Sequence, residues 1–117
     1  MKLILLCVVS FFSVSLFASP GLGGRQINIA YSDGQSYRLD FQNVEVTWQG
    51  TKGFDAGKSE KEKYQSIEVA PEVFLIHWTE SDGSFVDLVL NFVTNHAYSS
   101  GQSGRDQWFR QGILSPK

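Results

Sequence analysis

Apolar residues recur at every second position along most of the chain. The pattern is clearest in the segments Ile27–Tyr31, Tyr37–Phe41 and Val44–Gln49, and Tyr64–Val69 is predicted as another strand. A period of two is typical of β-strands that bury one face. Polar turn sequences at Ser32–Gln35 and Gln42–Asn43 separate the first three segments. The pattern predicts a series of short strands joined by tight turns.

The densest segment, VFLIHWTESDGSFVDLVLNF (Val73–Phe92), predicts a β-hairpin with a two-residue turn at Asp82-Gly83. This turn places Trp78 opposite Asp87 and Phe74 opposite Asn91. The first face then carries Phe74, Ile76, Trp78, Glu80, Phe85, Asp87, Val89 and Asn91. The second carries Val73, Leu75, His77, Thr79, Val86, Leu88, Leu90 and Phe92. We expect both faces to be at least partly covered, and the first, which mixes aromatic and polar groups, to resemble a ligand site.

The remaining segments add strands and connections. Gly50–Lys63 is rich in glycine and charge and predicts a long polar connection, in which the charge alternation of Gly57–Tyr64 indicates a solvated loop or edge. Thr94–Gly104 predicts one short strand, and Arg105–Leu114 a last strand or a short helix. Seven or eight short strands predict an all-β, antiparallel up-and-down barrel or half-barrel, with a two-sheet sandwich as the alternative.

The N-terminus has the layout of a secretory signal peptide, residues 1–18. Lys2 precedes an apolar run, Leu3–Phe17, and Ala18 and Ser19 are small. We expect cleavage after Ala18, a flexible leader over residues 19–24 and a single domain over 25–117; an uncleaved N-terminal anchor is the alternative. Cys7 is the only cysteine and would leave with the peptide. An exported domain without disulfides is commoner in the bacterial periplasm than among small secreted animal domains.

Charge and motifs exclude several classes of function. The formal net charge of −2 becomes more negative when Lys2 is removed, so there is no basic face for nucleic acid or for anionic lipid. His77 and His96 have no ligand-spacing motif, so no metal site is predicted. No phosphate-binding loop and no nucleophile elbow occur, and no cofactor is expected.

Several segments resemble a known group. HWTE (His77–Glu80), followed by a turn and VDLVLNF (Val86–Phe92), resembles the calycin-like barrels of the phenolic acid decarboxylases. It is more similar to the small domain of the molybdenum cofactor biosynthesis protein F (MoaF-like) group. Three more segments share the MoaF-like pattern: YSDGQSYRLDF (Tyr31–Phe41), VEVTWQG (Val44–Gly50) and KYQSIEVAPEVFLIHW (Lys63–Trp78). The resemblance spans roughly Gly24 to Gly101 and implies a calycin- or lipocalin-like barrel.

The decarboxylases bind a hydroxycinnamic acid inside the barrel without metal or organic cofactor. A glutamate handles protons there, and tyrosines with an arginine hold the carboxylate. By position, Glu80 matches the glutamate and Tyr31 matches the second of two tyrosines, whereas Ile29 replaces the first. The arginine falls in the long polar loop, where only Lys52 or Lys58 is present. Neither lysine can form the bidentate hydrogen bonds that arginine makes with a carboxylate. The resemblance therefore implies the fold rather than the decarboxylase chemistry.

Three functional hypotheses follow. The first is an exported barrel, more a binding protein than an enzyme, that holds a small apolar or aromatic ligand. Its candidate ligand-binding residues are Tyr31, Tyr37, Trp48, Phe74, Trp78, Phe85, Asp87 and Asn91. The second is a cofactor-free lyase or isomerase in which Glu80 is the acid/base and Tyr31 the anchor. The third is a module that forms a homodimer through Val73, Leu75, Leu88 and Leu90.

Each candidate also has a purely structural interpretation. Glu80 near a hairpin tip can reach water or pair with a basic residue, and Asp87 can pair with Arg38 or Arg105. The aromatic residues can fill the core, because the side chains of an eight-stranded barrel can pack its interior completely.

Overall fold

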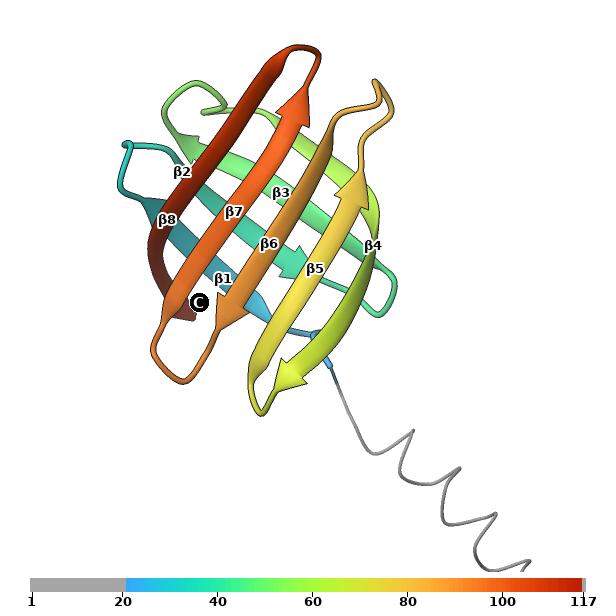
Figure 1. Ribbon diagram of the computed structural model, residues 1–117, viewed down its shortest axis with the longest axis vertical. Helices are drawn as coiled ribbons and strands as arrows, with labels where there is room; N and C mark the ends of the chain where they lie inside the picture. Colours follow the sequence, from blue (N-terminus) through green and yellow to red (C-terminus); the bar gives the residue numbers. More distant parts are fainter. Residues whose placement is uncertain (1–20, 117) are drawn as a thin grey trace, which may run out of the picture.

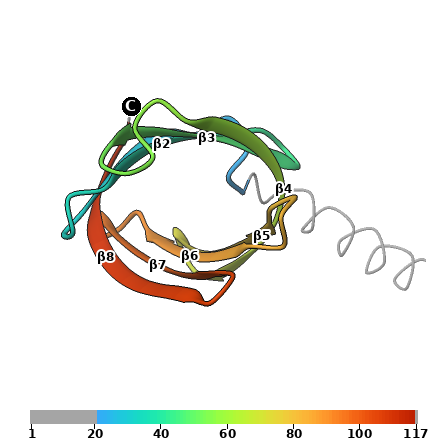
Figure 2. The same ribbon diagram turned by 90° about the horizontal axis from the view of Figure 1, so that it is seen from above.

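The computed structural model describes residues 21–116, which form eight antiparallel strands closed into one barrel (Figure 1, Figure 2). The predicted signal peptide, residues 1–18, and Ser19 and Pro20 of the predicted leader lie outside the described residues. The strands are β1 (Gln26–Tyr31), β2 (Ser36–Phe41), β3 (Glu45–Lys52), β4 (Ser59–Ala70), β5 (Val73–Thr79), β6 (Phe85–Asn91), β7 (His96–Ser103) and β8 (Asp106–Pro116).

Each strand pairs with the next along the chain, and β8 returns to pair with β1. In this last pairing Ile29 lies opposite Leu114 and Tyr31 opposite Gly112. A Cβ at Gly112 would lie 2.6 Å from the carbonyl oxygen of Ala30, so a residue without a side chain is needed there. The up-and-down barrel prediction is confirmed in its closed form. The segment predicted as a strand or short helix is strand β8, and the described residues contain no helix long and apolar enough to span a membrane.

The period-two alternation places one set of apolar side chains inside the barrel, as predicted. Ile27, Ile29, Leu39, Phe41 and Val46 are almost completely buried. Burial of each such side chain stabilises the fold by about 1.5–3 kcal/mol. The interior is completed by Phe74, Ile76, Leu88, Leu90, Ala97 and Leu114.

The turn between β5 and β6 is longer by one residue than the predicted turn. The Gly83 N–H donates to the Glu80 carbonyl (3.0 Å), and the Glu80 N–H donates to the Ser84 carbonyl (2.7 Å). Three residues therefore form the loop, with Gly83 at φ 90°, which is the three-residue hairpin that ends in a glycine bulge. The predicted two-residue turn at Asp82-Gly83 was wrong.

This single residue changes every pairing in the hairpin, because alternate residues face opposite sides. Trp78 lies opposite Val86 rather than Asp87, and Val73 rather than Phe74 lies opposite Asn91. The inward face consists of Phe74, Ile76, Trp78, Glu80, Val86, Leu88 and Leu90, whereas Phe85, Asp87, Val89 and Asn91 belong to the outward face.

The same register places the four residues of the predicted dimerisation surface on two different faces of the hairpin. Leu88 and Leu90 are core residues, 1% and 0% exposed, whereas Val73 and Leu75 belong to the outward face. Since the four side chains do not share one surface, that face was predicted wrongly.

Much of the predicted polar connection Gly50–Lys63 is strand. β3 extends to Lys52, and β4 begins at Ser59. Along β4 the residue Glu62 faces inward and is only 7% exposed, while Lys61 and Lys63 are exposed. Glutamates, and not apolar residues, occupy inward positions of β4. The sequence of this strand therefore does not alternate between apolar and polar residues.

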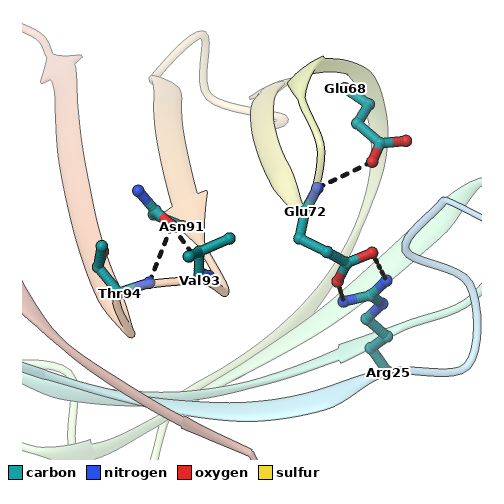
Figure 3. A network of polar contacts seen from close by, with 6 residues as sticks. All are labelled: Arg25, Glu68, Glu72, Asn91, Val93 and Thr94. Atoms are coloured by element: carbon teal, nitrogen blue, oxygen red, sulfur yellow. Dashed lines mark hydrogen bonds and ion pairs between the residues drawn. The ribbon is translucent and has the colours of Figure 1, made fainter.

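One end of the barrel, called here the packed end, is filled by side chains. Leu22, assigned by sequence to a leader, is 2% exposed and belongs to the core. The Arg25 guanidinium lies 4.5 Å from the Phe92 ring centroid and 5.3 Å from that of Phe74, and it pairs with Glu72 at 2.9 Å. Figure 3 shows this ion pair beside the β4–β5 turn, where the Glu72 N–H donates to Glu68.

We expect Leu22→Ala to lower the free energy of unfolding by about 2–5 kcal/mol, the usual cost of removing a buried leucine side chain. Val44→Ala is the control, because Val44 is 65% exposed and should change stability by less than about 0.5 kcal/mol. Chemical denaturation measures both. Equal effects would show that the segment before β1 contributes nothing to the core.

Candidate ligand-binding site

The opposite end of the barrel, called here the open end, contains a cavity of about 360 Å³. This end carries the turns at residues 32–35, 53–58, 80–84 and 104–105, and it is uppermost in Figure 1. A cavity of this size can hold a small molecule. Its lining comprises Ile29, Tyr31, Tyr37, Leu39, Trp48, Asp55, Lys58, Glu60, Trp78, Glu80, Asp82, Ser84, Val86, Leu88, Ser99, Ser103, Trp108 and Arg110.

Aromatic side chains form a large part of the wall. Tyr37 makes edge contacts with Tyr31 and Trp48, at ring-centroid distances of 6.0 and 6.1 Å. Trp108 lies against Gly101, where a Cβ would be 2.1 Å from the indole Cζ2. The indole can occupy this place only because residue 101 is glycine.

A basic group enters the cavity from β8. The Arg110 guanidinium lies 5.3 Å from the Tyr31 ring centroid and 5.5 Å from that of Trp108. Its Nε is 3.2 Å from Asp33 Oδ2, an ion pair whose N–H is not directed well enough to count as a hydrogen bond. Arg110 is thus held between two rings and one carboxylate.

The two tyrosines beside Arg110 are neutral at physiological pH. Burial raises the pKa of Tyr31 to about 12, although hydrogen bonding to Ser99 and the charge of Arg110 lower it in part. Burial and a hydrogen bond to Asp55 raise the pKa of Tyr37 to about 12. The Tyr37 hydroxyl donates to Asp55 Oδ2 at 2.5 Å.

Inward carboxyl groups follow β4 and β5: Glu60 and Glu80 line the cavity, whereas Glu62 is buried further along β4 and is not part of the lining. The Trp78 indole N–H donates to Glu80 Oε2 at 3.3 Å, and the Trp48 N–H donates to Glu62 Oε2 at 3.2 Å. Burial raises the pKa of both Glu80 and Glu62. A perturbed carboxyl group in the wall of a cavity, such as Glu80, is typical of functional sites. Within residues 21–116 no group of three or more His, Cys, Asp or Glu side chains is arranged to hold a metal ion.

The structure brings together five of the predicted site residues at this cavity and places four elsewhere. Tyr31, Tyr37, Trp48, Trp78 and Glu80 line the cavity. Phe74 lies at the packed end, where its ring contacts Phe92 at 5.9 Å. Phe85, Asp87 and Asn91 face outward because of the bulged turn.

The three outward residues have local partners. Asp87 Oδ1 is 2.7 Å from His77 Nδ1, instead of pairing with Arg38 or Arg105, and Phe85 lies beside the same imidazole. Asn91 Oδ1 accepts the Val93 and Thr94 N–H groups in the β6–β7 turn (Figure 3). None of the three is part of the cavity wall.

Sequence reasoning missed Arg110, Trp108, Asp55, Ser99 and Glu60. It sought an arginine in the polar loop, whereas the guanidinium comes from the last strand. The spacing of Trp108 and Arg110, two residues apart, was a signal that both share one face of a strand.

Comparison with known proteins supports the architecture. The sequence matches the MoaF-like family over residues 23–111. A crystal structure described as a "putative beta-lactamase from Burkholderia vietnamiensis" superposes with a TM-score of 0.80 at 21% sequence identity, and the match covers 84% of this chain and 97% of that one. At this identity the likeness shows the fold alone. No curated protein matches the sequence.

We expect Glu62→Gln to raise the melting temperature at pH 7 above that of the wild type. Because the folded-state pKa of Glu62 is raised, ionisation of this carboxyl destabilises the fold as the pH rises above the unfolded-state pKa. Glutamine cannot ionise, so the gain should be present at pH 7 and vanish below about pH 4, where Glu62 is protonated in both states.

Differential scanning calorimetry between pH 4 and pH 8 measures this difference. Glu45→Gln, on neighbouring β3, is the matched control and should leave the pH profile unchanged. If the melting temperatures of Glu62→Gln and of the wild type differ by the same amount at every pH, ionisation of Glu62 does not destabilise the fold.

Proposed function

Because the chain belongs to the MoaF-like family and its barrel contains an aromatic-lined cavity, we propose that it is an exported binding protein for a small aromatic molecule. The observation that carries the proposal is the cavity of about 360 Å³ at the open end. Eight-stranded barrels are wide enough to hold one small ligand.

The composition of the wall favours a flat ligand. Tyr37, Trp48 and Trp78 present large aromatic surfaces, and a few polar groups are placed among them. Binding pockets commonly combine such an apolar wall with a small number of orienting polar groups. The opposite end is filled by Leu22, Phe41 and Phe74, so a ligand would enter from the open end.

The N-terminal pattern supports export. Residues 1–18 have the charge, apolar run and small residues of a signal peptide, and Cys7 is the only cysteine in the sequence. An exported barrel without disulfides would suit the bacterial periplasm.

We expect the neutral probe N-phenyl-1-naphthylamine to bind in the cavity with increased fluorescence, and Val86→Trp to abolish this signal. Val86 lines the cavity, and an indole at this position would occupy the space of the ligand. A fluorescence titration measures the affinity.

Val89→Trp is the matched control, because Val89 lies on the outward face of the same strand. It should bind the probe as the wild type does. Equal binding by wild type and Val86→Trp would exclude the cavity as the site.

A second candidate is a cofactor-free lyase or isomerase that uses Glu80 as acid/base. The observation that favours it is that Glu80, Tyr31 and Arg110 line one cavity, so an arginine is available after all. Burial raises the pKa of Glu80, which is the direction expected of a carboxyl group that acts as a general acid.

If hydroxycinnamic acids are turned over, we expect Glu80→Gln to reduce kcat about 10²–10⁴-fold, the usual contribution of an acid/base group. Chromatographic detection of the product measures the rate. Glu45→Gln should retain full activity, and unchanged turnover by Glu80→Gln would eliminate Glu80 as the acid/base.

A further inference from the structure

We propose that the ligand of the cavity is an aromatic amine whose ammonium group lies between Glu60 and Glu80. This inference rests on the proposed binding function and specifies the charge of the ligand. It assigns the β4–β5 side of the cavity as the recognition site for the cation.

The balance of charge in the cavity wall carries the argument. Both basic side chains in the lining already have acidic partners. Lys58 Nζ lies 3.3 Å from Asp55 Oδ1, and Arg110 Nε lies 3.2 Å from Asp33 Oδ2. Within residues 21–116 no basic side chain forms an ion pair with Glu60 or Glu80. The cavity therefore has an excess of negative charge that a cationic ligand would balance.

The neighbours of Glu80 strengthen this conclusion. Its hydrogen-bond donor is the Trp78 indole N–H, which is neutral and leaves the carboxylate charge uncompensated. The groups that raise its pKa, besides burial, are the carboxylates of Asp82, Glu60 and Asp55. An ammonium beside Glu80 would be attracted strongly by this half-buried carboxylate and more weakly by the exposed carboxylates of Glu60 and Asp82, which water and salt screen.

The order of the strands separates this acidic side from Arg110. In a ring of eight strands, β4 lies opposite β8 (Figure 2). Glu60 on β4 and Arg110 on β8 therefore belong to opposite walls of the cavity. A cation at the acidic wall is kept away from the guanidinium.

The aromatic side chains suit the same ligand. Trp48 and Trp78 belong to β3 and β5, the two strands that flank β4. Indole rings attract ammonium groups through the negative potential of their faces, and they also stack against a flat ring. The described residues hold no metal-ligand cluster, which favours an organic cation over a metal ion.

The test uses three probes that share a phenyl ring on a short chain: 2-phenylethylamine, 2-phenylethanol and 3-phenylpropanoate. Isothermal titration calorimetry of the purified protein at pH 7 measures their affinities. We expect the amine to bind at least about ten times more tightly than the alcohol, and the carboxylate to bind most weakly, because like charges repel.

Charge-removing variants identify the recognising groups. Glu60→Gln and Glu80→Gln should each weaken binding of the amine about tenfold and leave binding of the alcohol unchanged. Glu45→Gln should change neither, because Glu45 is the first residue of β3 and does not line the cavity. Circular dichroism and melting temperature establish that each variant is folded.

The outcomes separate the two proposals. If the carboxylate or the alcohol binds as tightly as the amine, the cationic ligand is refuted while aromatic binding stands. If the amine binds best but neither glutamine variant weakens it, the assignment to Glu60 and Glu80 is refuted. If none of the three probes binds, the proposed function itself fails.

Discussion

The antiparallel pairing of β1 with β8 closes the sheet into a ring, and the location of every inward side chain depends on it. In a closed barrel no strand has a free edge, and alternate residues of all strands point to one enclosed interior. Gly112 makes the closure sterically feasible, because a Cβ there would collide with the Ala30 carbonyl. The barrel is thus specified by hydrogen-bonded pairing as much as by its apolar residues.

The two ends of the barrel interior differ in composition. At the packed end Leu22, Phe41 and Phe74 fill the space, and Arg25 covers Phe74 and Phe92. At the open end the inward positions carry hydroxyl, indole and carboxyl groups around a cavity. A single small domain can bury only a limited apolar area, so the packed end must supply most of the hydrophobic stabilisation.

Inward carboxylates are costly for such a domain, because acidic residues are rarely buried without a partner. Glu62 and Glu80 are each held by a single indole donor, and burial raises the pKa of both. Groups that cost stability in a folded chain are often retained for function. The proposed aromatic amine would offset the cost at Glu80 by supplying the missing positive charge.

The hairpin Val73–Phe92 shows why prediction of the site from sequence was partial. Its existence and its apolar character were readable, but the register depended on whether the turn held two or three residues. The glycine bulge at Gly83 moved Phe85, Asp87 and Asn91 to the outside and Val86 to the inside. Both turn types accept an Asp-Gly sequence, so local preference alone could not decide between them.

The sequence by itself determined the all-β class, the up-and-down order of strands and the inward placement of Ile27, Ile29, Tyr31 and Trp48, because period-two alternation is a local property of the chain. Only the tertiary structure decided that the ring closes, that β4 turns Glu62 inward, and that Arg110 lies beside Tyr31. These features join residues distant in sequence, and their positions follow from strand register and ring closure, which no local pattern encodes.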